Sequence, residues 1–200
     1  IPMDLYYAGI REAIPIQDVE IDKNYALVIT TNGGLWRYLI GDTVKFTSVN
    51  PYRIKISGRT KHYINAFGEE LMIDNVETAL KMACEQLDAS VSDYTGAPIF
   101  MTNKSKCCHE WIFEFTKKPN SIQEFTEVFD QSLKTLNSDY EAKRYNDITL
   151  RCPTIHAAKP NLFYEWMASR GKLGGQNKVP RLSNDRQYID TLLLLNETKV

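Results

Sequence analysis

The apolar positions in the first third of the chain follow the pattern of short β-strands. β-Branched and aromatic residues come in four short runs, and turn-forming residues at 32–34, 41–42 and 50–51 separate them. Runs of this length with glycine, asparagine and proline between them are typical of strands that pair with their neighbours along the chain. The pattern therefore predicts an antiparallel strand meander or a small barrel. The four predicted strands are residues 24–31, 35–40, 43–49 and 52–56.

From residue 74 onward, apolar residues at helical spacing predict four helices. The first begins near Asp74, which we interpret as its N-cap because a glutamate follows three residues later. The second begins at Ser121, where the pattern Ser-x-x-Glu is typical of a capping box, and it ends with the segment LNSDYEAKR. A short helix is predicted at residues 162–171, where a glycine ends it, and a final helix begins at Asp185.

Three further strands are predicted among these helices. They lie near residues 90–102, at 109–116 and at 147–158, and Pro153 in the last one favours an edge position. The order of elements is therefore helix, strand, strand, helix, strand, helix, followed by the final helix. This order indicates an α+β fold, in which the strand meander is followed by a small α/β-sandwich domain with helices against a sheet.

Residues 57–72, SGRTKHYINAFGEELM, fit neither a regular strand nor a regular helix. Glycines at 58 and 68 bracket a run in which apolar and polar residues mix, and two glycines so close together disfavour a helix. We interpret the stretch as a junction. Residues 63–67 are predicted to form a short strand, after which Gly68 turns the chain toward the next helix.

The composition and charge exclude several classes of function. There are 24 lysine and arginine residues against 25 aspartate and glutamate residues, so the chain as a whole has no attraction for nucleic acid or for an anionic membrane. The apolar run at residues 192–195 is far shorter than the ~20 residues that span a bilayer. The four cysteines include no C-x-x-C pair, which argues against a zinc site or a disulfide framework. We expect a cytoplasmic protein with reduced thiols and no metal site of its own.

Three polar residues stand where they could contact an anion or a nucleotide. Asp42 follows a predicted strand, where its carboxylate can accept hydrogen bonds from vicinal hydroxyls such as those of a ribose, although aspartate also forms turns. In an antiparallel sheet Arg59 would lie beside Asp42, as a binding guanidinium or in a surface salt bridge. Lys178 lies in the glycine-rich segment 170–186, where five basic residues and one acidic residue give a charge of +4. It could neutralise charge in a transition state or remain solvated.

Four segments of the chain, in this order and spacing, resemble the auxin-responsive Gretchen Hagen family of acyl-acid amido synthetases. The likeness runs over essentially the whole chain and is greatest to bacterial members and their C-terminal portion. The segments are GLWRYLIGDTVKFTS at 34–48, ISGRTKHYINAFGEEL at 56–71, LNSDYEAKR at 136–144 and GQNKVPRL at 175–182.

The resemblance implies an enzyme of the adenylate-forming superfamily, which uses ATP and Mg²⁺ to convert a carboxylic acid to an acyl-adenylate and then passes the acyl group to an amine. It implies that Asp42 holds the ribose hydroxyls, and that Tyr38 and Arg59 also contact the nucleotide. Lys61 falls at the hinge between two domains. Lys178 is similar to the lysine of the mobile domain that approaches the carboxylate and the α-phosphate during adenylation.

The resemblance also implies a domain organisation. Residues 1–58 would be the C-terminal end of the large nucleotide-binding domain, 59–72 the hinge, and 73–200 the small mobile domain. The phosphate-binding loop would belong to an N-terminal domain of the same protein that this chain lacks, so we expect the chain alone to be inactive. The expected partners are a small carboxylic acid, an amino acid and that N-terminal domain.

Two alternatives stay open at the level of sequence. An acyl-CoA-forming ligase of the same superfamily would use the same first half-reaction and the same residues. A non-catalytic α+β module could instead bind an anion or a partner protein through the basic segment 170–186.

Overall fold

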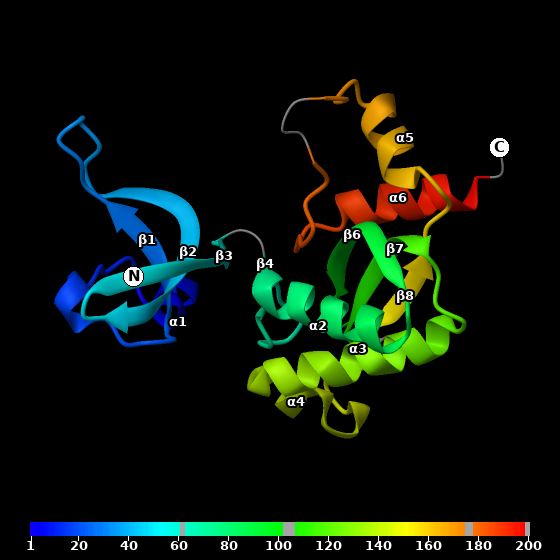
Figure 1. Ribbon diagram of the computed structural model, residues 1–200, viewed down its shortest axis with the longest axis horizontal. Helices are drawn as coiled ribbons and strands as arrows, with labels where there is room; N and C mark the ends of the chain where they lie inside the picture. The colour runs from blue at the N-terminus through cyan, green and yellow to red at the C-terminus, as the bar shows by residue number, and fades with distance from the viewer. Residues whose placement is uncertain (61–62, 102–106, 175–177, 199–200) are drawn as a thin grey trace. The chain divides into compact units, whose positions relative to one another are not determined.

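The structure is a computed structural model that describes residues 1–60, 63–101, 107–174 and 178–198. The chain divides into two compact units, Ile1–His62 and Tyr63–Val200 (Figure 1), and each unit has hydrophobic clusters of its own. All four cysteines are free thiols. None of the helices in the described part of the chain is long and apolar enough to cross a bilayer.

The first unit is built on an antiparallel sheet of three strands in the order β1-β2-β3, which confirms the predicted meander. A short helix and a 3-10 turn precede the strands in the sequence. The elements are α1 (Met3–Tyr7), η1 (Ile16–Asp18), β1 (Asn24–Ile29), β2 (Tyr38–Val49) and β3 (Tyr52–Arg59).

The predicted break at Gly41-Asp42 is wrong, because β2 passes through these two residues as a β-bulge. Between its pairings with Ala26 and Val28 of β1, the strand β2 contains extra residues. Gly41 has a φ of +92°, which glycine adopts without the steric penalty of a side chain. The two middle predicted strands are therefore one strand that bends at Gly41.

The second unit is an α+β sandwich around a mixed sheet of three strands in the order β6-β7-β8. β6 (Ser90–Ile99) pairs antiparallel with β7 (Cys108–Lys117). β8 (Thr154–Ala157) pairs parallel with β7 at the edge of the sheet, directly after Pro153, which confirms the predicted edge position. Because the strand begins only after the proline, no ladder hydrogen bond is lost to it.

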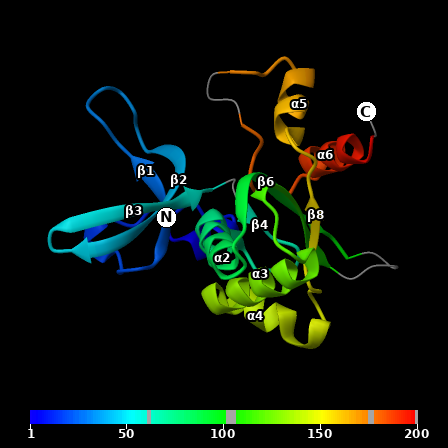
Figure 2. The ribbon, with the colours of Figure 1, turned by 45° about the vertical axis from the view of Figure 1, so that its right-hand side comes forward.

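Helices cover both faces of this sheet, as Figures 1 and 2 show. Alternation along β7 supplies both cores: Trp111 and Phe113 pack in the cluster of α2 and α3, whereas Ile112 packs in the cluster of α5 and α6. The helices are α2 (Ile73–Gln86), α3 (Ile122–Leu136), α5 (Leu162–Ser169) and α6 (Gln187–Glu197).

The start of α2 differs from the prediction. Met72 is the N-cap, so Asp74 lies inside the first turn and does not cap the helix. The side chain of Asn75 instead accepts a hydrogen bond from the Met72 N–H at 3.2 Å. An acidic residue in the first turn still interacts favourably with the helix dipole. The predicted start of the helix at Asp74 is two residues from the observed N-cap, Met72.

The segment LNSDYEAKR is a separate helix and not the end of α3. α4 (Ser138–Arg144) begins after Asn137, whose side chain accepts a hydrogen bond from the Tyr140 N–H at 2.8 Å. A 3-10 turn, η2 (Tyr145–Asp147), follows α4. The second N-cap therefore divides what the apolar pattern alone presents as one helix.

The second unit begins with a turn between two very short strands. β4 (Tyr63–Ile64) pairs antiparallel with β5 (Leu71–Met72). Only the first two residues of the predicted strand 63–67 are therefore in a strand. The turn closes because Asn65 Oδ1 accepts a hydrogen bond from the Gly68 N–H and because Gly68 has a φ of +93°.

Asp130 of α3 is the centre of a buried polar network that joins α3 to α4. Its Oδ1 accepts hydrogen bonds from Tyr140 Oη at 2.6 Å and Arg144 Nε at 2.8 Å. Its Oδ2 lies 2.8 Å from Arg144 Nη2 and 2.7 Å from Lys134 Nζ. Burial acts to raise the pKa of Asp130, but the hydrogen bonds from Arg144, Lys134 and Tyr140 outweigh it and hold the pKa below its usual value.

We predict that Asp130→Asn lowers the free energy of unfolding at neutral pH by about 3–5 kcal/mol, because the buried Arg144 loses its buried carboxylate partner and keeps only the exposed carboxylate of Asp147. Since the pKa of Asp130 is lowered in the folded state, its contribution is complete above the usual pKa of about 4 and disappears as the pH falls through the folded value. Urea unfolding at a series of pH values should therefore show the difference between wild type and variant shrinking in acid.

The exposed pair of Lys117 and Asp88 supplies the matched control for this prediction. Asp88→Asn removes a surface ion pair and should change the free energy of unfolding by less than ~1 kcal/mol. An equally small loss for Asp130→Asn at neutral pH would show that the network does not stabilise the second unit.

Candidate functional site

Asp42 and Arg59 face each other across the first unit's sheet. They are paired residues of β2 and β3, and Arg59 Nε lies 2.9 Å from Asp42 Oδ1. The backbone of the bulge is held in place, because Thr60 N–H donates to Gly41 O at 2.8 Å. The predicted position of Arg59 beside Asp42 is thus confirmed.

The pair keeps hydrogen-bonding capacity for a ligand. The Asp42 side chain is 25% exposed and the Arg59 side chain 60% exposed. Only one oxygen of Asp42 and one nitrogen of Arg59 join the two residues. The second carboxylate oxygen can accept from a hydroxyl group, and the outer guanidinium nitrogens can donate to an anion.

Two further residues predicted from the sequence are Tyr38 and Lys61. Tyr38 begins β2, pairs with Ile29 of β1 and has an exposed ring. No hydrogen bond joins Tyr38 to Asp42 or Arg59 among residues 1–60. Lys61 lies outside the described residues.

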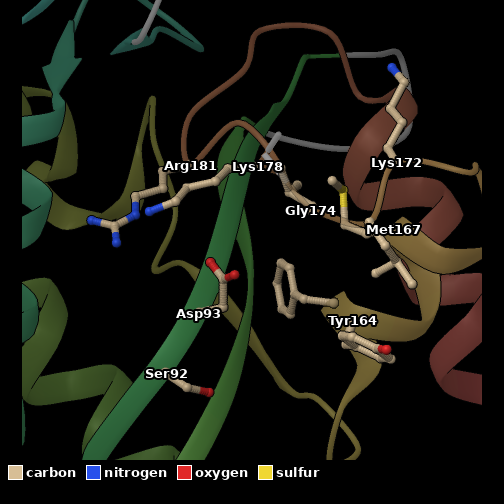
Figure 3. A pocket seen from close by; sticks show the side chains of 11 residues that line it. Ser92, Asp93, Tyr164, Met167, Lys172, Gly174, Lys178 and Arg181 are labelled. Atoms are coloured by element: carbon tan, nitrogen blue, oxygen red, sulfur yellow. The ribbon is translucent and has the colours of Figure 1, made fainter. Parts of the chain in front are cut away.

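Lys178 lines a cavity of about 530 Å³ in the second unit. β6 contributes Asp93 to this cavity, α5 contributes Met167, and the segment after α5 contributes Lys172. Figure 3 shows the Asp93 carboxylate directed toward the end of the cavity where the Lys178 side chain lies, whereas Lys172 points away from it. Arg181 also lines this end of the cavity, so Asp93 lies near two basic side chains, of which Arg181 is paired with Glu77.

Asp93 was not predicted from the sequence as a site residue. Burial raises its pKa, while a hydrogen bond from the Tyr94 N–H at 2.9 Å and the positive charge of Lys178 act in the opposite direction. The sequence contained a weak signal, because an aspartate stands within a run that forms a strand. Its relation to Lys178 depends on contacts between segments 85 residues apart and so was not visible in the local pattern.

Three of the five basic residues in segment 170–186 are already engaged within the second unit. Arg170 lies over the Trp166 ring at 4.0 Å, Arg181 pairs with Glu77, and Arg186 Nη2 lies 2.6 Å from an oxygen of Glu110. In the part of the chain that the structure describes, the side chains of Lys172 and Lys178 make no ion pair or hydrogen bond. The charge available to an outside anion is therefore smaller than the sequence suggests, which weakens the reading as a general anion-binding loop.

Comparisons with known proteins give the family of the chain. Residues 1–59 match the GH3 family central domain and residues 74–187 match the GH3 family C-terminal domain. From Arabidopsis thaliana, the probable indole-3-acetic acid-amido synthetase GH3.1 is 27% identical over 92% of this chain and 33% of its own length. The indole-3-acetic acid-amido synthetase GH3.3 is 28% identical over 85% of this chain and 30% of its own length.

A solved structure shares the fold. The GH3.15 acyl acid amido synthetase superimposes with a TM-score of 0.69 at 24% identity, over 93% of this chain and 36% of that chain. The chain thus spans about a third of the length of the curated relatives that it matches. The central-domain match includes Asp42 and Arg59 of the β-meander. The C-terminal-domain match includes Asp93 and Lys178, which line the cavity. The chain therefore belongs to the GH3 family.

Proposed function

We propose that the chain is the C-terminal part of an ATP-dependent acyl-acid amido synthetase. Such an enzyme adenylates a carboxylic acid and then transfers the acyl group to the amine of an amino acid. The observation that carries the proposal is the match to relatives named as indole-3-acetic acid-amido synthetases over 92% of this chain. Indole-3-acetic acid is consequently the first acid to test. A further N-terminal domain of the same protein would complete the active site, and we place the enzyme in the cytoplasm.

In this proposal the first unit holds the nucleotide. The free oxygen of Asp42 accepts a hydrogen bond from a ribose hydroxyl, and Arg59 fixes the carboxylate through its Nε. Tyr38, exposed at the start of the same strand, contacts the nucleotide as well. The partial exposure of Asp42 and Arg59 supports this role, because a fully buried ion pair could not reach a ligand.

Mg²⁺ would accompany the phosphates of ATP. Within residues 1–60, 63–101, 107–174 and 178–198, no group of three or more His, Cys, Asp or Glu side chains could hold a metal ion. The roles proposed for Asp42, Arg59 and Lys178 do not depend on such a group.

Lys178 is proposed to act during adenylation. When the carboxylate of the acid attacks the α-phosphate, negative charge builds on the oxygens around phosphorus, and a nearby ammonium group lowers the barrier by stabilising that charge. The exposed position of Lys178 at one end of the cavity leaves the ammonium group free to meet a substrate. A lysine delivered by a domain movement would act only in the closed state.

Lys61 is proposed as the pivot of that movement, within the hinge 59–72. Two observations favour a pivot between Thr60 and Tyr63. Arg59 is the last residue of β3 and is bonded to β2, while Tyr63 is already the first residue of β4 in the second unit. Bending within β3 or within the β4–β5 pair would break strand pairing.

The role of Lys178 predicts a large and specific loss of adenylation. In the full-length protein, Lys178→Ala should slow acid-dependent exchange of labelled pyrophosphate into ATP by about 100-fold or more, while the affinity for ATP changes little. Lys172→Ala removes the same charge from the same cavity on a side chain that points elsewhere, and should leave the exchange rate close to wild type. Equal effects of the two substitutions would contradict the assignment.

The role of Asp42 predicts a loss of nucleotide affinity. Asp42→Asn keeps the shape of the side chain but removes the charge, so the Kd for ATP should rise by about 10-fold, as expected when a charged hydrogen bond is weakened. Isothermal titration of the full-length protein measures this constant. Asp88→Asn, which changes an exposed carboxylate of the second unit, should leave the Kd unaltered. An unchanged Kd in Asp42→Asn would remove Asp42 from the nucleotide site.

A further inference from the structure

The segment that follows the candidate lysine is bonded along β6. Gly96 N–H donates to Arg181 O at 2.9 Å, and Ser183 N–H donates to Gly96 O at 3.1 Å. One residue earlier, Thr95 Oγ1 donates to Pro180 O at 2.6 Å. These three hydrogen bonds fix the backbone from residue 180 to residue 183 against the sheet.

Side chains of this segment strengthen the attachment. Leu182 is fully buried in the same cluster as Ile64 and Leu71 of the short β4–β5 ribbon. Arg181 pairs with Glu77 of α2 and lies over the Tyr94 ring at 5.2 Å. The base of the Lys178 segment is thus part of the core of the second unit.

Asn184 also makes hydrogen bonds to the backbone of β4 and the residue after it. Its Oδ1 accepts a hydrogen bond from the Asn65 N–H at 2.9 Å, and its Nδ2 donates to the Tyr63 carbonyl oxygen at 3.2 Å. A neighbouring parallel strand would offer the same pair of groups to the residues on either side of Ile64. The side-chain amide of Asn184 therefore takes the place of a strand partner.

We propose that Asn184 is a positioning residue for adenylation, which fixes the Lys178 segment to the backbone at 63–65. The inference rests on the proposed role of Lys178. The amide bridge holds the base of the Lys178 segment at a fixed distance from the backbone of β4.

The expected effect is large relative to the two hydrogen bonds involved. Reacting groups must come within about 3–3.5 Å in the correct orientation, and a displacement of ~1 Å can cost about 100-fold in rate. Loss of the bridge loosens the base of the Lys178 segment relative to β4, although the hydrogen bonds to β6 remain. Asn184 would then affect the rate of adenylation without touching a substrate.

Asn196 provides a matched control within the same unit. Its Oδ1 accepts a hydrogen bond from the Lys159 N–H at 2.8 Å, and its Nδ2 donates to the Ala157 carbonyl oxygen at 3.2 Å. The amide bridge is chemically the same as that of Asn184 and spans the same two-residue interval. It joins α6 to the end of β8, however, and among the described residues its amide makes no hydrogen bond to the segment 178–184.

The test compares Asn184→Ala with Asn196→Ala in the full-length protein, with Lys178→Ala as reference. The probe is exchange of labelled pyrophosphate into ATP with the most active acid of a panel that begins with indole-3-acetic acid. We expect Asn184→Ala to lower kcat for this exchange by about 10- to 100-fold at unchanged KM for ATP, while Asn196→Ala stays close to wild type. Acyl transfer from added acyl-adenylate to the amine, which does not use Lys178, should keep its wild-type rate in both variants.

A second measurement needs no substrate. Amide hydrogen exchange should show faster exchange at Asn65 in Asn184→Ala than in wild type or Asn196→Ala, with similar melting temperatures for the two variants. The proposal is overturned if both asparagine variants slow pyrophosphate exchange by the same factor, or if Asn184→Ala matches wild type while Lys178→Ala is impaired. A wild-type exchange rate in Lys178→Ala would instead refute the proposed function of that lysine, and the inference would fall with it.

Discussion

The arrangement of the second unit depends on one buried carboxylate, that of Glu69. Its side chain is fully buried, and it accepts hydrogen bonds from the backbone N–H groups of Ala66 and Phe67 and lies 2.6 Å from His109 Nε2. A buried charge costs several kcal/mol unless such partners compensate for it. Burial acts to raise the pKa of Glu69, but the hydrogen bonds outweigh this effect and lower the pKa. The carboxylate therefore requires the turn after β4 and the first residues of β7 to lie together.

Contacts around Glu69 also fix the position of the segment LNSDYEAKR. The His109 ring stacks on Tyr140 with centroids 5.7 Å apart, and Tyr140 in turn donates to Asp130. Asn137, which caps α4, also donates through Nδ2 to the Glu69 carbonyl oxygen at 3.1 Å. The residues of this segment thus hold the turn between β4 and β5 against the sheet.

Much of the fold could be predicted from the sequence because its main signals are local. Alternation in 109–116 and the Ser121 cap predicted β7 and α3, and the meander predicted that Arg59 meets Asp42. The errors arose where a local rule has two solutions. Gly41 could end a strand or form a bulge, and pairing with β1 decided for the bulge. The Glu69–His109 contact and the partners of the loop arginines connect segments far apart in the sequence, and no periodicity records them.

One account fits the GH3 family match, the partly exposed Asp42–Arg59 pair and the position of Lys178. In this account the chain provides the nucleotide-binding pair and the adenylation lysine of an amido synthetase. The most direct test is mass spectrometry of the products that the full-length protein forms from ATP and a panel of acids, with amino acids and coenzyme A in competition. The account predicts AMP, pyrophosphate and an N-acyl amino acid. An acyl-CoA thioester as the product, or ADP in place of AMP, would contradict it.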